Sequence, residues 1–461
     1  MLAMDRLSAL DAAFVSLDRL GAPYVVGSVM VFDRDPDARP RVDLALMRTF
    51  VGAAIDRVPA YRRRIGRIPV LRHPVWLDDE AFDIGHHVEE ISLPPPGTDE
   101  QLWEVAGKLL AGDLPPEHPP WRLWYVDELP GDRFALISAV HHCLIDGISG
   151  VRLLEHMLQG RPDAAQPTRV PWSAEPAPPA RSLLRAELEY RLRGMRALPG
   201  QLRGHGNALP GLVSVLRDGL MSAPDAGINP RHTGRDRLVV GTTMDLATIK
   251  EIKNHFGVSI NDVVLAIAAS AMRRYLQRRG VDVDQLGWLR AMVPVSTHGD
   301  DHALSGSRVA LLLIPLPLSE KDPARVVARV HAATAESKHR STSEAGDLLT
   351  RTADVTAPSL LAGVLALSMA RRGFNLIITN VPGPPFPLYV PGAKLISFHA
   401  IVNLWPGQAL GLALLSYAGT LHWSVHADRA AVPDAAGLPA DLQAAFAELR
   451  DAARAPAASA A

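Results

Sequence analysis

The chain has 461 residues, of which 48% are hydrophobic and 21% are charged, and its formal net charge is -1. This length exceeds what one compact core supports, so two domains of about 200 residues are expected. A nearly neutral chain has no bulk attraction for nucleic acid, and a nucleic-acid partner is therefore not expected. Cys143 is the single cysteine, which excludes intrachain disulfide bonds and fits a reducing, cytoplasmic setting.

Residues 1–165 are predicted to form the first domain. Hydrophobic patterning predicts helices over residues 9–17 and 42–58 and a strand over residues 25–32. Residues 121–128 and 133–142 are predicted strands, and the turn-forming segment between them indicates a β-hairpin. Proline and alanine are abundant over residues 161–180, which is typical of a linker.

The second strand of this hairpin ends at two adjacent histidines, His141 and His142. Asp146 and Gly147 follow in the turn before a predicted helix. A histidine with a pKa near 6.5 can accept a hydroxyl proton at neutral pH. Adjacent strand residues point to opposite faces, so only one of the two rings can face a given cavity. An isolated His-His pair is more often structural, but the full spacing at a strand end favours chemistry.

A linker containing a helix (residues 166–235) and a second domain (residues 236–461) are predicted to follow. The second domain is expected to contain helices over residues 246–256, 261–279 and 322–338, with strands over residues 237–244, 288–295, 309–316, 376–380, 409–417 and 420–426. Arg290 lies in one of these strands. Asn261 and Asp262 begin the middle helix, where capping alone would account for them.

The spacing His-His-x-x-x-Asp-Gly over residues 141–147 resembles the signature of the chloramphenicol-acetyltransferase-like acyltransferases, which include peptide-synthetase condensation domains. Five further segments are similar to those of the bacterial wax ester synthase/diacylglycerol acyltransferases and occur in that family's order, namely residues 120–121, 261–264, 290–296, 380–384 and 416–419. The resemblance covers nearly the whole chain. It implies an α/β (α+β) fold of two chloramphenicol-acetyltransferase-like domains, each a mixed β-sheet flanked by helices, with the active site in a channel between them.

The resemblance also implies roles for individual residues. His142, His141 and Asp146 form the catalytic group: His142 is the general base, His141 supports the loop as a hydrogen-bond donor, and Asp146 pairs with an arginine, for which Arg290 is the candidate. Gly147 permits the tight turn of the motif. Residues expected to line the channel are Asn261, Asp262, Asn380, Pro382 and Gly383. For the Pro-Gly-Pro segment, a purely structural turn is the alternative.

The predicted function is transfer of a long-chain fatty acyl group from acyl-CoA to diacylglycerol or a long-chain alcohol, giving triacylglycerol or wax ester. The sequence has no metal-ligand spacing, phosphate-binding loop or serine elbow, so no metal and no cofactor are expected beyond the coenzyme A thioester as co-substrate. One alternative is a condensation-type enzyme using carrier-protein thioesters. Another is a catalytically silent protein that binds lipid surfaces, which departures from the family pattern at Tyr24 and Gly306-Ser307 leave open.

Residues 181–220 begin with leucines interspersed among arginines. This basic amphipathic pattern fits a helix lying on an anionic lipid surface, and it fits equally an interdomain helix packed on the protein. Pro199, Gly200 and Gly204 are expected to interrupt the helix. The expected location is the cytoplasm and, if the helix binds lipid, the inner face of the membrane or lipid droplets.

Overall fold

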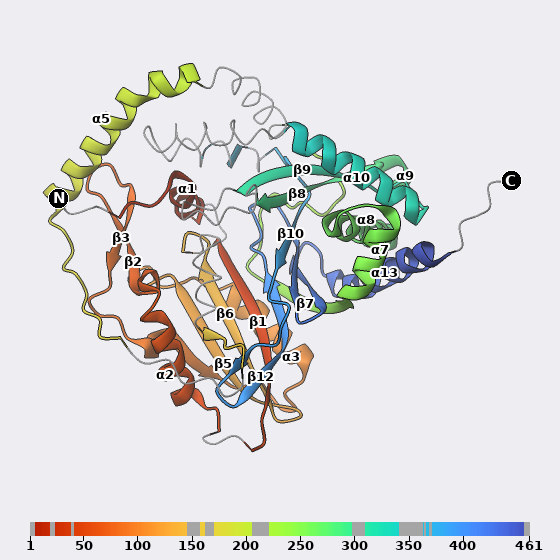
Figure 1. Ribbon diagram of the computed structural model, residues 1–461. Helices are drawn as coiled ribbons and strands as arrows, with labels where there is room; N and C mark the ends of the chain where they lie inside the picture. Colours follow the sequence, from red (N-terminus) through yellow and green to blue (C-terminus); the bar gives the residue numbers. More distant parts are fainter. Residues whose placement is uncertain are drawn as a thin grey trace.

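The computed structural model describes residues 5–18, 24–37, 41–144, 157–161, 170–204, 221–296, 309–340, 363, 366–367 and 371–455. In these residues the chain forms two six-stranded sheets with helices packed on their faces, and a separate two-stranded hairpin (Figure 1). The predicted fold class, two sheet-containing domains of mixed α/β structure, is confirmed.

The first sheet has the strand order β11-β12-β1-β6-β5-β4. Its strands are β1 (Val25–Arg34), β4 (Val88–Ile91), β5 (Trp121–Leu129), β6 (Arg133–His141), β11 (Tyr389–Val390) and β12 (Ala393–Ile401). Alternating residues of β1 divide between its two faces, as a period of two requires. Met30 packs with helix α2 (Leu44–Ile55), and Val29 packs with helix α3 (Asp99–Leu110).

Strands β11 and β12 enter the first sheet from the last quarter of the chain. Strand β12 pairs antiparallel with β1, with Gly27 opposite Ile401 and Val29 opposite His399. The predicted second domain therefore supplies two strands to the first sheet. Hydrophobic patterning did not indicate this exchange, because pairing partners far apart in sequence leave no local signal.

The second sheet has the strand order β7-β14-β13-β10-β8-β9. Its strands are β7 (Arg237–Asp245), β8 (Trp288–Ser296), β9 (Val309–Pro317), β10 (Leu376–Pro382), β13 (Leu410–Tyr417) and β14 (Thr420–Asp428). One face packs against four helices in a large apolar core: α7 (Leu246–Phe256), α8 (Ile260–Arg278), α10 (Pro323–Arg340) and α13 (Leu438–Arg454). These helices lie on the side of the sheet away from α1 (Ala9–Leu17) (Figure 1).

The opposite face of the second sheet contacts the N-terminal part of the chain. Met292 of β8, Ile377 of β10 and Ala413 of β13 form one apolar cluster with Phe14 of α1 and with Tyr24. Helix α1 and Tyr24 thus lie between the two sheets, next to the start of β1.

Most predicted bounds agree closely with the structure, and those of α1 and α7 are identical to it. The structure adds elements that patterning did not predict, including α3, α13, the short helix α9 (Val283–Leu286) and the hairpin of β2 (Arg63–Arg67) and β3 (Pro74–Asp78). The predicted break at Pro199 is wrong, since helix α5 runs over Ala180–Gly204. A proline removes one helical donor without obliging the helix to end.

No single helix in the parts of the chain described here is long and apolar enough to cross a membrane. The sharply bent pair formed by α7 and α8 passes that test by length and composition only. Most of α8 is buried in the core of the second sheet.

Candidate active site

Strand β6 ends at His141, and its two faces differ in exposure towards that end. Ala139 and His141 are buried on the side of α3, whereas Ser138, Val140 and His142 keep partial exposure on the other side. Strands β1 and β5 flank β6, so β6 is an interior strand of the first sheet. Side chains of an interior strand keep exposure only where the face of the sheet is not fully covered. The partly exposed side of β6 is therefore the candidate path to His142.

Neighbouring strands continue this candidate path. Val26 of β1 lies opposite Val140, and Ala400 of β12 lies opposite Ser28, and both Val26 and Ala400 are partly exposed. Ser28 and Ser138 share a hydrogen bond of 2.7 Å between their hydroxyl oxygens. We call Val26, Ser138, Val140, His142 and Ala400 the open strip; its wall is mainly apolar.

His142 is held by its main chain and by one aromatic contact. Its N–H donates to the carbonyl oxygen of Tyr24 at 2.7 Å, which extends the pairing of β6 with β1 by one residue. Its ring centroid lies 4.4 Å from that of Phe14. Nδ1 is buried, and the described part of the chain offers it no hydrogen-bond partner. Since the residue is partly exposed, Nε2 is the nitrogen that can meet a substrate.

The imidazole of His142 is neutral at pH 7. Burial lowers its pKa to about 4; the neighbouring His141 acts in the same direction, and the main-chain carbonyl of His142 opposes both. A neutral imidazole has a free lone pair, so His142 is able to accept a proton at every pH well above its pKa.

His141 points to the other side and has a fixed tautomer. Its Nδ1 accepts the main-chain N–H of Cys143 at 3.1 Å, so the ring proton lies on Nε2, which donates to the Asp18 carboxylate at 2.9 Å. The other oxygen of Asp18 accepts the N–H of Tyr24 at 2.9 Å. Asp18 thus connects the end of α1, the start of β1 and the end of β6.

Asp18 and Phe14 were missed by the sequence reasoning. One signal for Asp18 was available, because it caps the C-terminal end of α1, where the helix dipole disfavours a carboxylate. An acidic residue at that position indicates another partner. Here the partner is His141, 123 positions away along the chain.

Asp146 and Gly147 lie outside the described residues, so the pairing of Asp146 with Arg290 stays a prediction. Arg290 lies in β8, and its guanidinium donates to the carbonyl oxygens of Met221 at 2.7 Å and Gly373 at 3.0 Å. These bonds connect β8 to the segments that contain Met221 and Gly373.

Asn261 and Asp262 lie at the start of α8, and the structure does not bring them to His142. Asp262 forms a reciprocal capping box with Ser259, and His331 lies 2.9 Å from its carboxylate. Helix α8 covers the face of the second sheet opposite to the one that contacts Phe14. These contacts account for Asp262 by capping, and a role in the channel stays a prediction.

Asn380, Pro382 and Gly383 lie at the end of β10, beside β13. A Cβ atom on Gly383 would lie 2.2 Å from the carbonyl oxygen of Ser416, so only glycine fits there. The Gly383 N–H also donates to the Ser416 hydroxyl at 3.2 Å. These contacts support the structural-turn alternative for this segment, which leads into the crossover to β11, and its role in the channel stays a prediction.

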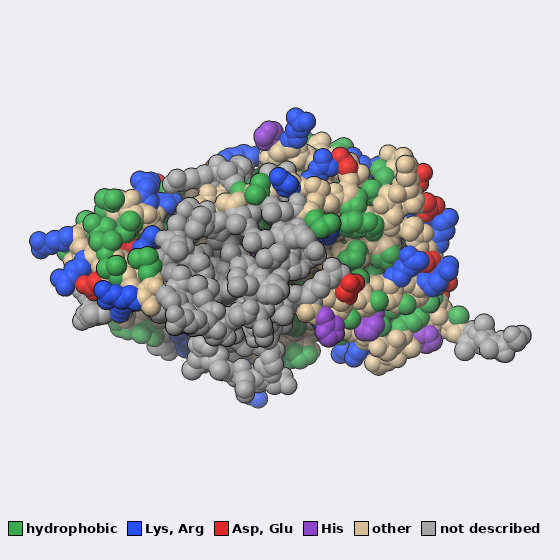
Figure 2. Space-filling view, turned by 90° about the horizontal axis from the view of Figure 1, so that it is seen from above, with side chains coloured by type: hydrophobic (Ala, Val, Ile, Leu, Met, Phe, Trp, Pro, Cys, Tyr) green, Lys and Arg blue, Asp and Glu red, His purple; other side chains and the backbone are tan. Residues whose placement is uncertain are grey.

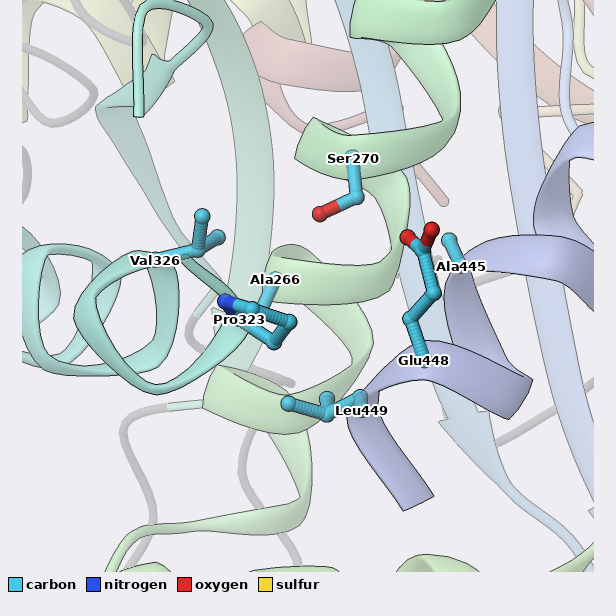
Figure 3. A pocket seen from close by; sticks show the side chains of 7 residues that line it. All are labelled: Ala266, Ser270, Pro323, Val326, Ala445, Glu448 and Leu449. Carbon is cyan, nitrogen blue, oxygen red and sulfur yellow. The ribbon is translucent and has the colours of Figure 1, made fainter. Parts of the chain in front are cut away.

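A small hollow lies elsewhere, among α8, α10 and α13 (Figure 3). Its polar lining groups are Ser270 and Glu448, and Glu448 accepts a hydrogen bond from Arg274. It lies on the helix-covered side of the second sheet, away from the open strip. We assign it no catalytic role.

Two sheets joined by exchanged strands, with helices on their faces, form the predicted chloramphenicol-acetyltransferase-like fold. Residues 7–264 match the catalytic domain of the wax ester synthase/diacylglycerol acyltransferases, and residues 305–450 match their C-terminal domain. The chain belongs to the wax ester synthase/diacylglycerol acyltransferase family, and the predicted family and enzyme class are confirmed.

Individual relatives agree with this assignment. A probable diacylglycerol O-acyltransferase of Mycobacterium tuberculosis is 31% identical over 97% of this chain and 99% of its own length. The O-acyltransferase WSD of Acinetobacter baylyi is 29% identical over 93% of each chain.

Solved structures share the fold at lower identity. The wax ester synthase/diacylglycerol acyltransferase of Marinobacter aquaeolei superposes with a TM-score of 0.71 at 24% identity, covering 98% of this chain and 100% of that one. The starter condensation domain of rhizomide synthetase, in complex with C8-CoA, gives 0.59 at 14% identity, covering 98% and 95%.

Replacement of Asp18 by Asn should lower kcat by about 10- to 100-fold with little change in KM, because His141 and the strand end lose their anchor while the substrate path stays open. Asp18→Glu keeps the carboxylate and should therefore retain part of the kcat that Asp18→Asn loses. Asp43, which caps α2, is the matched control. Asp43→Asn should leave both the melting temperature and kcat nearly unchanged, because asparagine caps a helix about as well as aspartate. An Asp18→Asn enzyme with normal kcat would contradict the positioning role.

Replacement of Val140 by Trp should fill the open strip next to His142. We expect kcat/KM for a sixteen-carbon acyl-CoA to fall much more than that for a four-carbon one, since the longer chain needs more of the apolar wall. Thiol release with both donors, together with the melting temperature, measures this. Equal losses for both chain lengths, in a protein of normal stability, would show that Val140 does not line the acyl path.

Proposed function

We propose that this chain transfers a long-chain fatty acyl group from acyl-CoA to the hydroxyl of diacylglycerol or of a long-chain alcohol. The products are triacylglycerol or wax ester, with coenzyme A released as its thiol. The observation that carries the proposal is His142, a neutral and partly exposed imidazole at the end of the open strip. Membership of the family supports the reaction class.

In the proposed reaction, Nε2 of His142 removes the proton of the acceptor hydroxyl as its oxygen attacks the thioester carbonyl. The carbon–sulfur bond then breaks, and the proton passes from His142 to the departing thiolate. A positioned base of this kind contributes about 10²–10⁴ to the rate, and holding both substrates in one channel adds an entropic contribution. The step needs no cofactor, since the thioester is itself the activated donor.

Cys143 gives no support to a covalent acyl-enzyme. Its side chain is buried, burial raises the pKa of its thiol well above the usual value, and its sulfur lies 2.8 Å from Nδ1 of His141. A thiol of this kind is mostly protonated at neutral pH and is a poor nucleophile. Direct transfer between two bound substrates is therefore the favoured order.

The wall of the open strip supports a long acyl chain over a short one. Val26, Val140 and Ala400 offer apolar surface on three adjacent strands. Each methylene removed from water contributes about 0.8 kcal/mol, so such a path favours long donors.

The two alternative functions have less support. The similarity to condensation domains concerns the fold, at 14% identity for rhizomide synthetase, whereas the family match includes both domains of the lipid acyltransferases. A silent lipid-binding protein would have no use for a neutral, accessible histidine. Because diacylglycerol and long-chain alcohols are poorly soluble, we also propose that the enzyme works at a lipid surface, on the inner face of the membrane or on lipid droplets.

Purified protein with palmitoyl-CoA and either hexadecanol or a diacylglycerol should release thiol and form the ester, and His142→Ala should lower that rate by about 10²–10⁴. The control position is His87, a buried histidine that stacks on Trp121 and is not part of the open strip. His87→Gln should keep most of the activity if it folds. Thiol release by His142→Ala equal to that of the unchanged enzyme would reject the mechanism.

A further inference from the structure

Helix α5 is an arm at the edge of the molecule, beside the β2–β3 hairpin and separate from the two central cores (Figure 1). It carries five arginines and two glutamates over residues 180–196, the part whose side chains are described. The two faces of this helix differ sharply in their surroundings.

The inner face of α5 is fixed to the protein. Leu183 packs on Ile68 and Val75 of the β2–β3 hairpin. Glu187 is fully buried and accepts hydrogen bonds from Arg6 at 2.7 Å and Arg191 at 2.7 Å. Removing one partner of such a buried pair leaves an uncompensated charge, so this contact holds the helix in one rotational setting.

The segment that leads into α5 is also held, although it was predicted to be a linker. The Val170 N–H donates to the carboxylate of Asp56 at 2.7 Å, and Arg62 pairs with the same carboxylate and lies 4.7 Å over the ring of Trp172. Arg62 is itself buried. The root of the arm is anchored, which fixes the direction in which its outer face points.

The outer face presents a row of large apolar side chains to solvent. Leu188, Leu192 and Met195 are 46%, 48% and 48% exposed, and their spacing of four and three residues places them in one line. We call these three residues the outer stripe. Exposed Arg181, Arg185, Arg193 and Arg196 border it. Figure 2 shows apolar side chains bordered by basic ones on the lobe that α5 forms.

We propose that the outer stripe docks on an anionic phospholipid bilayer and that it is the surface by which the enzyme reaches the lipid phase. This inference rests on the proposed function, which requires poorly soluble acceptors. The row of apolar side chains enters the boundary between headgroups and acyl chains, and the arginines contact the lipid phosphates. Glu189, the partly exposed acidic residue of this region, is already paired with Arg185, so the face is basic as a whole.

Flotation of the full-length protein on vesicles tests the docking surface. Wild-type protein should float with phosphatidylcholine vesicles that contain 30% phosphatidylglycerol and should float poorly with phosphatidylcholine alone. The variant Leu188→Ser, Leu192→Ser, Met195→Ser should lose at least fivefold in bound fraction. Leu311→Ser, at an apolar residue of β9 that is 43% exposed, is the matched control and should float normally.

The charges are tested separately. A triple variant should float less well with the anionic vesicles, and its flotation should no longer depend on salt concentration. The three substitutions are Arg185→Gln, Arg193→Gln and Arg196→Gln. Arg325→Gln and Arg329→Gln, at exposed arginines of α10, are the matched pair and should have no effect.

Activity on soluble substrates separates docking from catalysis. The outer-stripe variant should keep normal thiol release with hexanoyl-CoA and butanol in the absence of vesicles. Undiminished flotation of that variant, or failure of the wild-type protein to float, would overturn the docking surface. So would a wild-type dimer in light scattering that the variant converts to a monomer. A wild-type protein that floats but transfers no acyl group would instead reject the proposed function alone.

Discussion

The site depends on one main-chain hydrogen bond, from the N–H of His142 to the carbonyl oxygen of Tyr24 at 2.7 Å. It continues the antiparallel pairing of β1 with β6 beyond Val25 and His141. Successive side chains of a strand point to opposite faces of the sheet. The register of β6 on β1 therefore determines that His142 faces the open strip and that His141 faces Asp18. A shift of one residue would exchange the two rings. The base would then be buried beside Asp18, and the structural histidine would lie on the proposed substrate path.

The exchanged strand β12 determines where that path lies. It pairs with β1 in the first sheet and lies against β13 and β14 of the second. Tyr417 of β13 fixes the crossover, since its hydroxyl accepts the N–H of Leu388 at 2.8 Å and donates to the carbonyl oxygen of Leu395 at 2.9 Å. The two sheets are therefore joined by hydrogen bonds and not only by a connecting segment. An apolar wall built from β1, β6 and β12 keeps its position relative to the second sheet.

Local patterns in the sequence predicted the helices of α1 and α7 and the hairpin that carries the motif, because each depends on residues close together in the chain. They did not predict β12, whose partner β1 lies more than 300 positions earlier, or Asp18, whose partner is 123 positions away. The role of His142 came from resemblance to a family; spacing alone left a structural pair open. For Asp262, position at a helix start was enough to predict its capping role. Its expected place in the channel came only from the resemblance.

The central claim is that His142 is a neutral imidazole that a substrate can reach. Nuclear magnetic resonance of protein labelled with ¹⁵N at histidine measures this directly, with His142→Ala identifying the signals. The account predicts that these signals titrate near pH 4, where burial places the pKa, and that they shift when a non-hydrolysable acyl-CoA analogue is added. Titration near the ordinary value of 6.5, or signals that do not respond to the analogue, would contradict it.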